Sequence, residues 1–292
     1  MALEEAGVNY IDTYHRTGLY KLPLPAIIGR EGAGVVQAVG AEVKDVAVGD
    51  RVVFFAAGSY ATHALVDFAS VVRLAQGLSF KDAVAAHVQG LTAHAFTTDA
   101  YRVKAGDFIL IHAAAGGTGN LLLQMCKIRG ATVIATVGSS DKAALAKAAG
   151  ADYVINYSTQ NFPEEVRKIV PAGVHAVYDG VGAATFEGSM KSLRKRGTLV
   201  TFGNASGPVP PVEPLTLTAH GSIFLTRPTV AHFIEQRSEL EARTKEIHEW
   251  ILAGKLQLRI AKEYPLSEAK LAHEALESRK FAGKILLNTK QC

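Results

Sequence analysis

The loop at 114–119 is rich in small residues whose spacing suits a phosphate group. In the pattern Ala114-x-Gly116-x-x-Gly119, alanine takes the first glycine position of a fingerprint that binds the pyrophosphate of a dinucleotide. An apolar run at 108–112 predicts a strand before this loop, and 120–129 predicts a helix after it. Small residues let the backbone approach a pyrophosphate, whose charge the N–H groups at the helix start would stabilise. The predicted cofactor residues here are Gly116, Gly117, Thr118 and Gly119.

A second predicted strand, 132–137, completes a β-α-β unit, and the residues at its end indicate which dinucleotide binds. Sites for NAD usually carry Asp or Glu there, bonded to the ribose 2′-OH. This chain has Gly138, Ser139, Ser140, Asp141 and Lys142 instead. Hydroxyl and ammonium groups favour a 2′-phosphate, which a carboxylate would repel, and we interpret Asp141 as part of the capping region of a helix over 141–149. We therefore predict NADPH rather than NADH, with Tyr157, after a predicted strand at 153–156, adding a hydroxyl to the phosphate pocket.

Composition limits the class of protein. The 292 residues suffice for two domains, and 48% hydrophobic with 20% charged residues is ordinary for a globular α/β chain. No apolar stretch is long enough to span a bilayer, and the N-terminus lacks a secretory pattern. Two cysteines, Cys126 and Cys292, cannot form a disulfide framework, so we expect a reducing, cytoplasmic setting.

The net charge of +4 is mild, and its densest basic cluster is small. The cluster consists of Lys191, Arg194, Lys195 and Arg196. A solvated helix end explains it better than contact with an anion or a nucleic acid.

The predicted secondary structure differs between two parts of the chain. Strand-like runs at 131–137, 153–156, 175–178, 198–202 and 222–225 alternate with helical patterns, which predicts a doubly wound parallel sheet. The first 90 residues instead hold β-rich runs between glycine turns, at 32–40, 50–55 and 60–66, which is typical of a small antiparallel or barrel-like domain. In the tail we predict a long amphipathic helix from 228 to about 253, a strand at 256–260, a helix at 267–278 and a strand at 284–287. This tail is expected to complete the first domain.

Motifs along nearly the whole chain carry a family resemblance. They are Gly-Val-Asn-Tyr-Ile-Asp-Thr-Tyr at 7–14, Gly-Leu-Tyr at 18–20, Gly-Arg-Glu-Gly-Ala-Gly at 29–34, Gly-Asp-Arg-Val at 49–52, His-Ala-Ala-Ala-Gly-Gly-Thr-Gly at 112–119, Tyr-Asp at 178–179, Phe-Gly-Asn-Ala-Ser-Gly at 202–207, Thr-Arg-Pro at 226–228 and His-Glu-Ala-Leu-Glu-Ser at 273–278. Together they resemble the zinc-independent quinone oxidoreductase (zeta-crystallin-like) branch of the medium-chain dehydrogenase/reductase superfamily.

The resemblance implies a GroES-like catalytic domain over 1–90, completed by 229–292, and a Rossmann dinucleotide-binding domain over 91–228. Members of the family begin earlier than this chain, so we expect the first strands of the GroES-like domain to be missing, through a shortened sequence or a natural variant. Lost strands would leave neighbouring backbone groups unpaired or paired with another chain.

The chemistry predicted for this chain uses no metal. Zinc-dependent relatives hold zinc with a cysteine and a histidine where this chain has Asn9 and Arg30, and neither an amide nor a guanidinium suits that role. His87 and His94 lie seven residues apart, a spacing that suits helix packing as well as metal binding. Without a Lewis acid to lower the pKa of an alcohol, reduction of an electrophilic acceptor is favoured over alcohol oxidation. Holding the acceptor over a nicotinamide supplies much of the rate.

The resemblance also implies the remaining site residues. Asn9 would orient the nicotinamide or the acceptor oxygen, Tyr14 would bond the cofactor and offer a proton, and Tyr20 would line the pocket. Further cofactor contacts are implied for Phe202, Gly203, Asn204, Ala205, Leu225, Thr226, Arg227 and Arg279. Arg279 has an equally good explanation as a cation at the C-terminal end of a helix.

We therefore predict an NADPH-dependent quinone reductase. The alternatives are a reductase of enones or alkenals, and an NADPH-binding protein with a crystallin-like or RNA-binding role and no turnover. No membrane partner is expected, and an RNA-binding signature of aromatics within a basic groove does not stand out. The resemblance implies a homodimer that joins strand 222–225 to its twin, which would protect an apolar edge.

Overall fold

The computed structural model describes residues 1–291, which form two compact units. Unit 1 combines the segment up to Leu91 with the segment from Phe233 onward, and unit 2 is Thr92–His232. Helix α2 (Phe80–Ala95), followed by a π-helical turn (Phe96–Ala100), carries the chain from the first unit into the second. Within the described residues, no helix combines the length and apolar character needed to cross a membrane.

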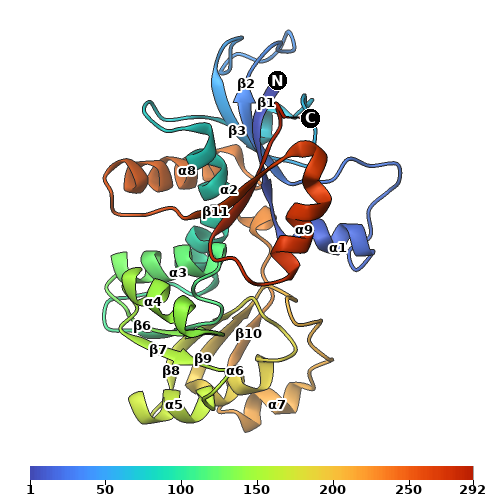
Figure 1. Cartoon of the computed structure of the whole chain (residues 1–292). Coiled ribbons are helices and arrows are strands. Elements are labelled where there is room, and N and C mark those ends of the chain that lie inside the picture. The colour runs from blue at the N-terminus through green and yellow to red at the C-terminus, as the bar shows by residue number, and fades with distance from the viewer. Residues whose placement is uncertain (292) are drawn as a thin grey trace. The chain divides into compact units, whose positions relative to one another are not determined.

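Unit 1 is built on a mainly antiparallel six-stranded sheet in the order β11-β12-β1-β2-β3-β4 (Figure 1). Its strands are β1 (Ala2–Val8), β2 (Glu31–Val35), β3 (Arg51–Phe55), β4 (Val71–Arg73), β11 (Ile260–Pro265) and β12 (Lys284–Asn288). Its helices are α1 (Tyr10–Thr17), α8 (Arg237–Leu252) and α9 (Ala269–Glu277), beside short 3₁₀ turns at Phe68–Ser70 and Leu266–Glu268, and a further 3₁₀ turn at Val230–Phe233 spans the boundary between the two units. The last strand of the chain therefore pairs with the first, antiparallel, from Glu5–Asn288 to Val8–Ile285.

The sheet of unit 1 buries apolar residues on both faces. Leu3 packs with Val52 and Phe54, whereas Ala6 and Val8 pack with residues of α9 and β12. A strand that is covered on both sides can carry small and apolar residues without strict alternation.

Unit 2 is a doubly wound parallel sheet in the order β10-β9-β8-β5-β6-β7, as predicted. Its strands are β5 (Phe108–Ile111), β6 (Thr132–Val137), β7 (Tyr153–Asn156), β8 (Val174–Asp179), β9 (Leu193–Thr201) and β10 (Phe224–Thr226). Its helices are α3 (Gly117–Ile128), α4 (Ser140–Ala148), α5 (Phe162–Ile169), α6 (Phe186–Ser192) and α7 (Pro214–Ala219). Figure 1 shows α3 and α4 on one face of this sheet and α5, α6 and α7 on the other.

Three predicted elements differ from the structure. Residues 60–66 form no strand; they meet the chain start through an isolated bridge between Ala2 and His63 and through backbone hydrogen bonds with Met1 and Leu3. The predicted helix from 228 to 253 is interrupted, because a 3₁₀ turn ends at Phe233 and α8 begins only at Arg237. The predicted strand at 256–260 lies later, as β11, whose residues find their parallel partners on β12.

Candidate functional site

The glycine loop of unit 2 lies where β5 passes into α3. Gly116 precedes α3, and its N–H donates to the carbonyl of Ala113 at 2.8 Å. A Cβ on Gly119 would lie 2.4 Å from that same carbonyl oxygen, so only glycine lets the helix approach the strand this closely. The N–H groups in the first turn of any α-helix lack intrahelical acceptors. The loop thus fits the cradle for a pyrophosphate that its spacing predicts.

The residues predicted to hold a 2′-phosphate meet beyond the end of β6. Ser139 caps α4, with its Oγ accepting from the Lys142 N–H at 3.4 Å. Tyr157 follows β7, and a Cβ on Gly138 would lie 2.8 Å from its hydroxyl oxygen. Gly138 therefore makes room for the tyrosine. Asp141 lies in the first turn of α4, while Ser139 is the residue that caps it.

Arg227 joins the ends of β9 and β10 at the same edge of the sheet. Its guanidinium donates to the Thr201 hydroxyl at 3.2 Å, to the Gly203 carbonyl at 3.1 Å and to Asn204 Oδ1 at 3.1 Å. A Cβ on Gly203 would lie 2.1 Å from the carbonyl oxygen of Gly180, so the loop after β9 packs closely against the loop after β8 and leaves no room for a side chain at Gly203. The carboxyl ends of parallel strands form the edge where doubly wound sheets bind ligands.

A buried polar cluster that no sequence pattern predicted supports this edge from within. Asp179, at the end of β8, accepts from the Val181 and Gly182 N–H groups and from the hydroxyls of Thr185 and Ser189. The Ser189 hydroxyl in turn lies 3.0 Å from Nε2 of His112. Burial lowers the pKa of His112, which keeps the ring neutral and able to link the end of β5 to Thr136 on β6 and Ser189 on α6. The Tyr-Asp motif at 178–179 was the sequence signal for this cluster.

The candidate catalytic residues of unit 1 surround α1. Tyr14 and Tyr20 pack edge to face with ring centroids 5.2 Å apart, and the Tyr20 N–H donates to the Tyr14 carbonyl. Gly18 ends α1 in the left-handed conformation, at φ 78°, which turns the chain so that the two rings meet. The structure therefore brings Tyr14 and Tyr20 together, and their catalytic role stays a prediction.

Asn9 precedes α1 and is buried, with contacts to two charged side chains. Its Nδ2 donates to Glu31 at 2.7 Å, and its Oδ1 accepts from Lys284 Nζ at 2.8 Å. Lys284 and Glu31 form an ion pair with side chains 1% and 0% exposed. The Gly-Arg-Glu motif drew attention to Glu31 without assigning it a role, whereas no pattern marked Lys284.

A second chain of polar contacts begins at Asp12 in α1. Tyr60 donates to Asp12 Oδ2 at 3.1 Å, and its oxygen lies 3.0 Å from His273 Nε2. Arg16 lies 3.0 Å from His273 Nδ1 and pairs with Glu277 at 2.7 Å. These contacts assign the proton of His273 to Nε2, because Arg16 can only donate. Burial raises the pKa of Asp12 to about 7, against the opposing hydrogen bond from the Asn9 backbone.

The remaining candidates lie on α2 or just after α9. Arg279 follows α9 in unit 1, at φ 54°, with its N–H donating to the Leu276 carbonyl. His87 and His94 are both buried on α2, and burial lowers the pKa of His87 to about 3. Within residues 1–291, no three His, Cys, Asp or Glu side chains gather closely enough to hold a metal ion.

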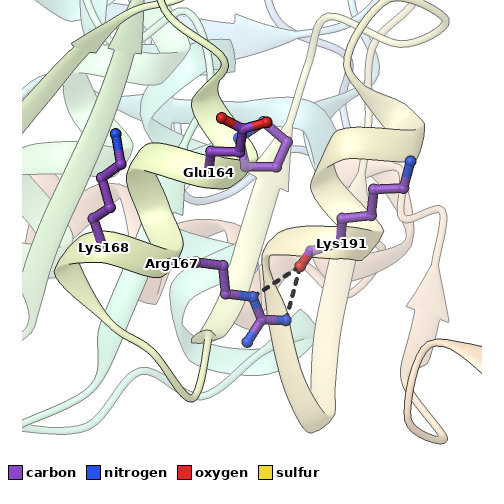
Figure 2. A pocket seen from close by; sticks show the side chains of 5 residues that line it. Glu164, Arg167, Lys168 and Lys191 are labelled. Atoms are coloured by element: carbon purple, nitrogen blue, oxygen red, sulfur yellow. Dashed lines mark hydrogen bonds between the residues drawn. The ribbon is translucent and has the colours of Figure 1, made fainter.

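A surface pocket of about 460 Å³ between α5 and α6 contains none of the predicted residues. It is lined by Pro163, Glu164, Arg167, Lys168 and Lys191. Figure 2 shows the Arg167 guanidinium turned toward the Lys191 carbonyl, to which it donates at 3.2 and 2.8 Å. Arg167 also donates to the carbonyls of Pro171 and Leu193, so it holds the end of α6 to neighbouring turns. The pocket is accordingly a poor candidate for the chemistry.

Known proteins resemble the chain over most of its length. The alcohol dehydrogenase GroES-like domain matches residues 1–76, and the zinc-binding dehydrogenase family matches residues 117–252. Quinone oxidoreductase of Salmonella typhimurium is 42% identical over 287 residues, covering 96% of this chain and 88% of the relative. The 2-haloacrylate reductase of a Burkholderia species is 39% identical, covering 96% and 87%.

Solved structures agree with these relatives. Escherichia coli quinone oxidoreductase in complex with NADPH has a TM-score of 0.96 at 39% identity, covering 98% of this chain and 90% of that one. A mycobacterial protein in complex with NADPH has a TM-score of 0.95 at 43% identity, covering 99% and 90%. The GroES-like and Rossmann folds, the motifs and these identities lead to one conclusion. The chain belongs to the quinone oxidoreductase family within the medium-chain dehydrogenase/reductase superfamily.

Proposed function

We propose that this protein reduces quinones with NADPH. The observation that carries the proposal is the end of β6, where Ser139 caps α4, Tyr157 lies beside Gly138, Lys142 lies in the first turn of α4, and no carboxylate occupies the usual NAD position. The glycine loop fits a pyrophosphate, because a Cβ on Gly119 would collide with the strand end. Relatives near 40% identity that are named quinone oxidoreductases support the acceptor class.

The proposed reaction consumes one hydride and one proton for each quinone. Bound NADPH supplies the hydride, and the products are NADP⁺ and the hydroquinone. In unit 2, the loop at 116–119 would hold the pyrophosphate, and Ser139, Lys142 and Tyr157 the 2′-phosphate. In unit 1, Asn9, Tyr14 and Tyr20 would orient the acceptor and stabilise negative charge that develops on its oxygen.

NADPH oxidation by the purified chain tests this function. The assay follows NADPH absorbance with a panel of quinones and, in parallel, a panel of enones and haloacrylates. Turnover of quinones above all other acceptors is expected. Preferred turnover of 2-haloacrylates or enones would favour the second candidate, which the 39% identical 2-haloacrylate reductase supports. Tight NADPH binding without turnover of any acceptor would instead indicate a role that does not use catalysis.

We further propose that the protein is a cytoplasmic homodimer. Strand β10 lies at the edge of the unit 2 sheet and begins at Phe224 rather than at 222. Phe224 is 61% exposed there, and pairing of two such edges across a two-fold axis would cover it. A dimeric mass by light scattering at micromolar concentration is expected, with dissociation in Phe224→Pro. A monomeric parent, or a Phe224→Pro variant that stays dimeric, would refute this assembly.

A further inference from the structure

Three strands of unit 1 place a charged pair and an amide side by side. Lys284 begins β12, Glu31 begins β2, and Asn9 directly follows β1, which pairs with both strands. The β1–β12 register runs through Val8 opposite Ile285, and one further step puts Asn9 opposite Lys284. The fold itself therefore brings together residues that lie 275 positions apart in the chain.

Each charged group in this cluster has named partners. Lys284 Nζ donates to Glu31 Oε1 and, at 2.8 Å, to Asn9 Oδ1. Glu31 Oε1 also accepts from Asn9 Nδ2 at 2.7 Å, and Oε2 accepts from the Val88 N–H at 2.6 Å. A Cβ on Gly7 would lie 2.2 Å from Glu31 Oε1, so the glycine leaves the space that the carboxylate fills.

The two charges allow only one orientation of the Asn9 amide. A flipped amide would turn its NH₂ group toward the Lys284 ammonium and its oxygen toward the Glu31 carboxylate, and both contacts would be repulsive. Within residues 1–291, Glu31 is the acceptor that Nδ2 contacts, so one N–H of this group is left for a further acceptor.

Burial of this ion pair needs a reason other than stability. Removing two ions from water costs several kcal/mol for each ion, and a well-packed apolar pair is often as stable. What an apolar pair could not supply is a fixed direction for the amide. Asn9 is also the residue directly before α1, and α1 carries Tyr14.

We propose that Lys284 is a positioning residue for the reductase reaction: together with Glu31 it holds Asn9 Oδ1 toward the Lys284 ammonium. The second N–H of Asn9 Nδ2 then donates to a carbonyl oxygen of the cofactor or the acceptor. The inference rests on the proposed function, because it assigns that oxygen to a bound ligand of the same site.

A double-mutant cycle between Lys284 and Asn9 tests the inference by turnover. Lys284→Met should lower kcat/KM for the quinone by about 10- to 100-fold, the scale of a misplaced site group. The same change should have little further effect in an Asn9→Ala background, because the amide it positions is gone. Lys284→Gln should recover part of the loss, since its amide still donates to Oδ1. The exposed Lys255→Met is the matched control and should retain parental kinetics.

Equal losses from Lys284→Met in both backgrounds would overturn the proposal, as would equal activity of Lys284→Gln and Lys284→Met. If Lys284→Met does not fold, the neutral combination with Glu31→Gln removes both charges and keeps the cycle measurable.

The side-chain amide signals of Asn9 in a ¹⁵N–¹H NMR spectrum, assigned with Asn9→Ala, provide a readout that needs no turnover. They should shift in the Lys284 variants and not in Lys255→Met. Shifted signals in a protein that reduces no acceptor would refute the proposed function alone, whereas unshifted signals would refute the positioning role.

Discussion

Lys142 is the residue whose positive charge we propose to favour NADPH over NADH. Lys142→Ala should weaken NADPH binding by about 1–3 kcal/mol, the scale of a charge-assisted hydrogen bond, and leave NADH binding nearly unchanged. Titration calorimetry with both nucleotides measures this difference. Lys147→Ala, on the same helix and bonded to the Asp152 carbonyl, is the control and should affect neither nucleotide. Equal affinity of the parent protein for NADH and NADPH would contradict the assignment.

Asp12 predicts a pH dependence of stability. Its folded pKa is raised to about 7 by burial, whereas the unfolded carboxyl titrates near about 4. Between these values the unfolded chain binds fewer protons than the folded one, so this group lowers the free energy of unfolding as pH rises. Below the unfolded pKa its contribution is fully favourable. Glu5, whose pKa burial also raises to about 7, acts in the same direction.

Asp12→Asn should therefore flatten the fall in stability between about pH 4 and pH 7, because the amide can accept the same bonds from Asn9 and Tyr60 without titrating. Urea unfolding at several pH values measures the slope. Asp45→Asn, at an exposed carboxyl, is the control and should keep the parental slope. An unchanged slope in Asp12→Asn would show that Asp12 ionises alike in both states.

Residue patterns predicted the β-α-β units of the Rossmann fold well because their signals are local. The loop at 116–119 and Ser139 directly follow predicted strands, and the Tyr157 hydroxyl lies beside Gly138, while the binding roles of these residues stay predictions. Glu31 and Lys284 lie 253 residues apart, and no local spacing relates them. Only the pairing of β1 with β2 and β12 makes them neighbours.

Whole strands also differ in whether local sequence or distant pairing determines them. Strands β6 and β7 match their predicted bounds, since apolar runs between helices identify buried parallel strands. Strand β1 was not predicted: its residues Ala-Leu-Glu-Glu-Ala-Gly-Val form no regular alternation of apolar and polar residues, and it is a strand because two neighbours pair with it. Residues 60–66 have suitable residues, but their pairing with Met1–Leu3 amounts to an isolated bridge, so they form no strand.

The close contact of α3 with β5 gives a prediction about an element. Gly119→Ala should destabilise the protein by about 1–3 kcal/mol and weaken NADPH binding, because its Cβ would lie 2.4 Å from the Ala113 carbonyl oxygen. Gly40→Ala, where the nearest atom to the new Cβ is 4.0 Å away, is the control. Thermal unfolding with and without NADPH checks both effects. A Gly119→Ala variant as stable as the parent would show that the loop yields more easily than its geometry implies.

At the scale of the whole molecule, this chain is expected to work without a metal, because Asn9 and Arg30 stand where zinc-dependent relatives carry zinc ligands. Asn9 is engaged by Glu31 and Lys284, and Arg30 lies over the Phe55 ring at 5.6 Å. Metal analysis of the purified protein should find no stoichiometric zinc, and chelators should leave quinone turnover unchanged. One tightly held zinc per chain, lost together with activity on chelation, would contradict this expectation.

The pairing of the first strand with the last has a consequence for biosynthesis. Unit 2 is one continuous segment, so it can fold while the ribosome is still adding residues. Unit 1 must wait, because Glu31 emerges early and the ammonium that neutralises it arrives only with Lys284. A nascent or prematurely terminated chain would have to bury Glu31 uncompensated, which is strongly unfavourable. In chains that lack β12, β1 would thus stay unpaired on that side and exposed to proteases. The native fold of unit 1 would form only after Lys284 and β12 have been added.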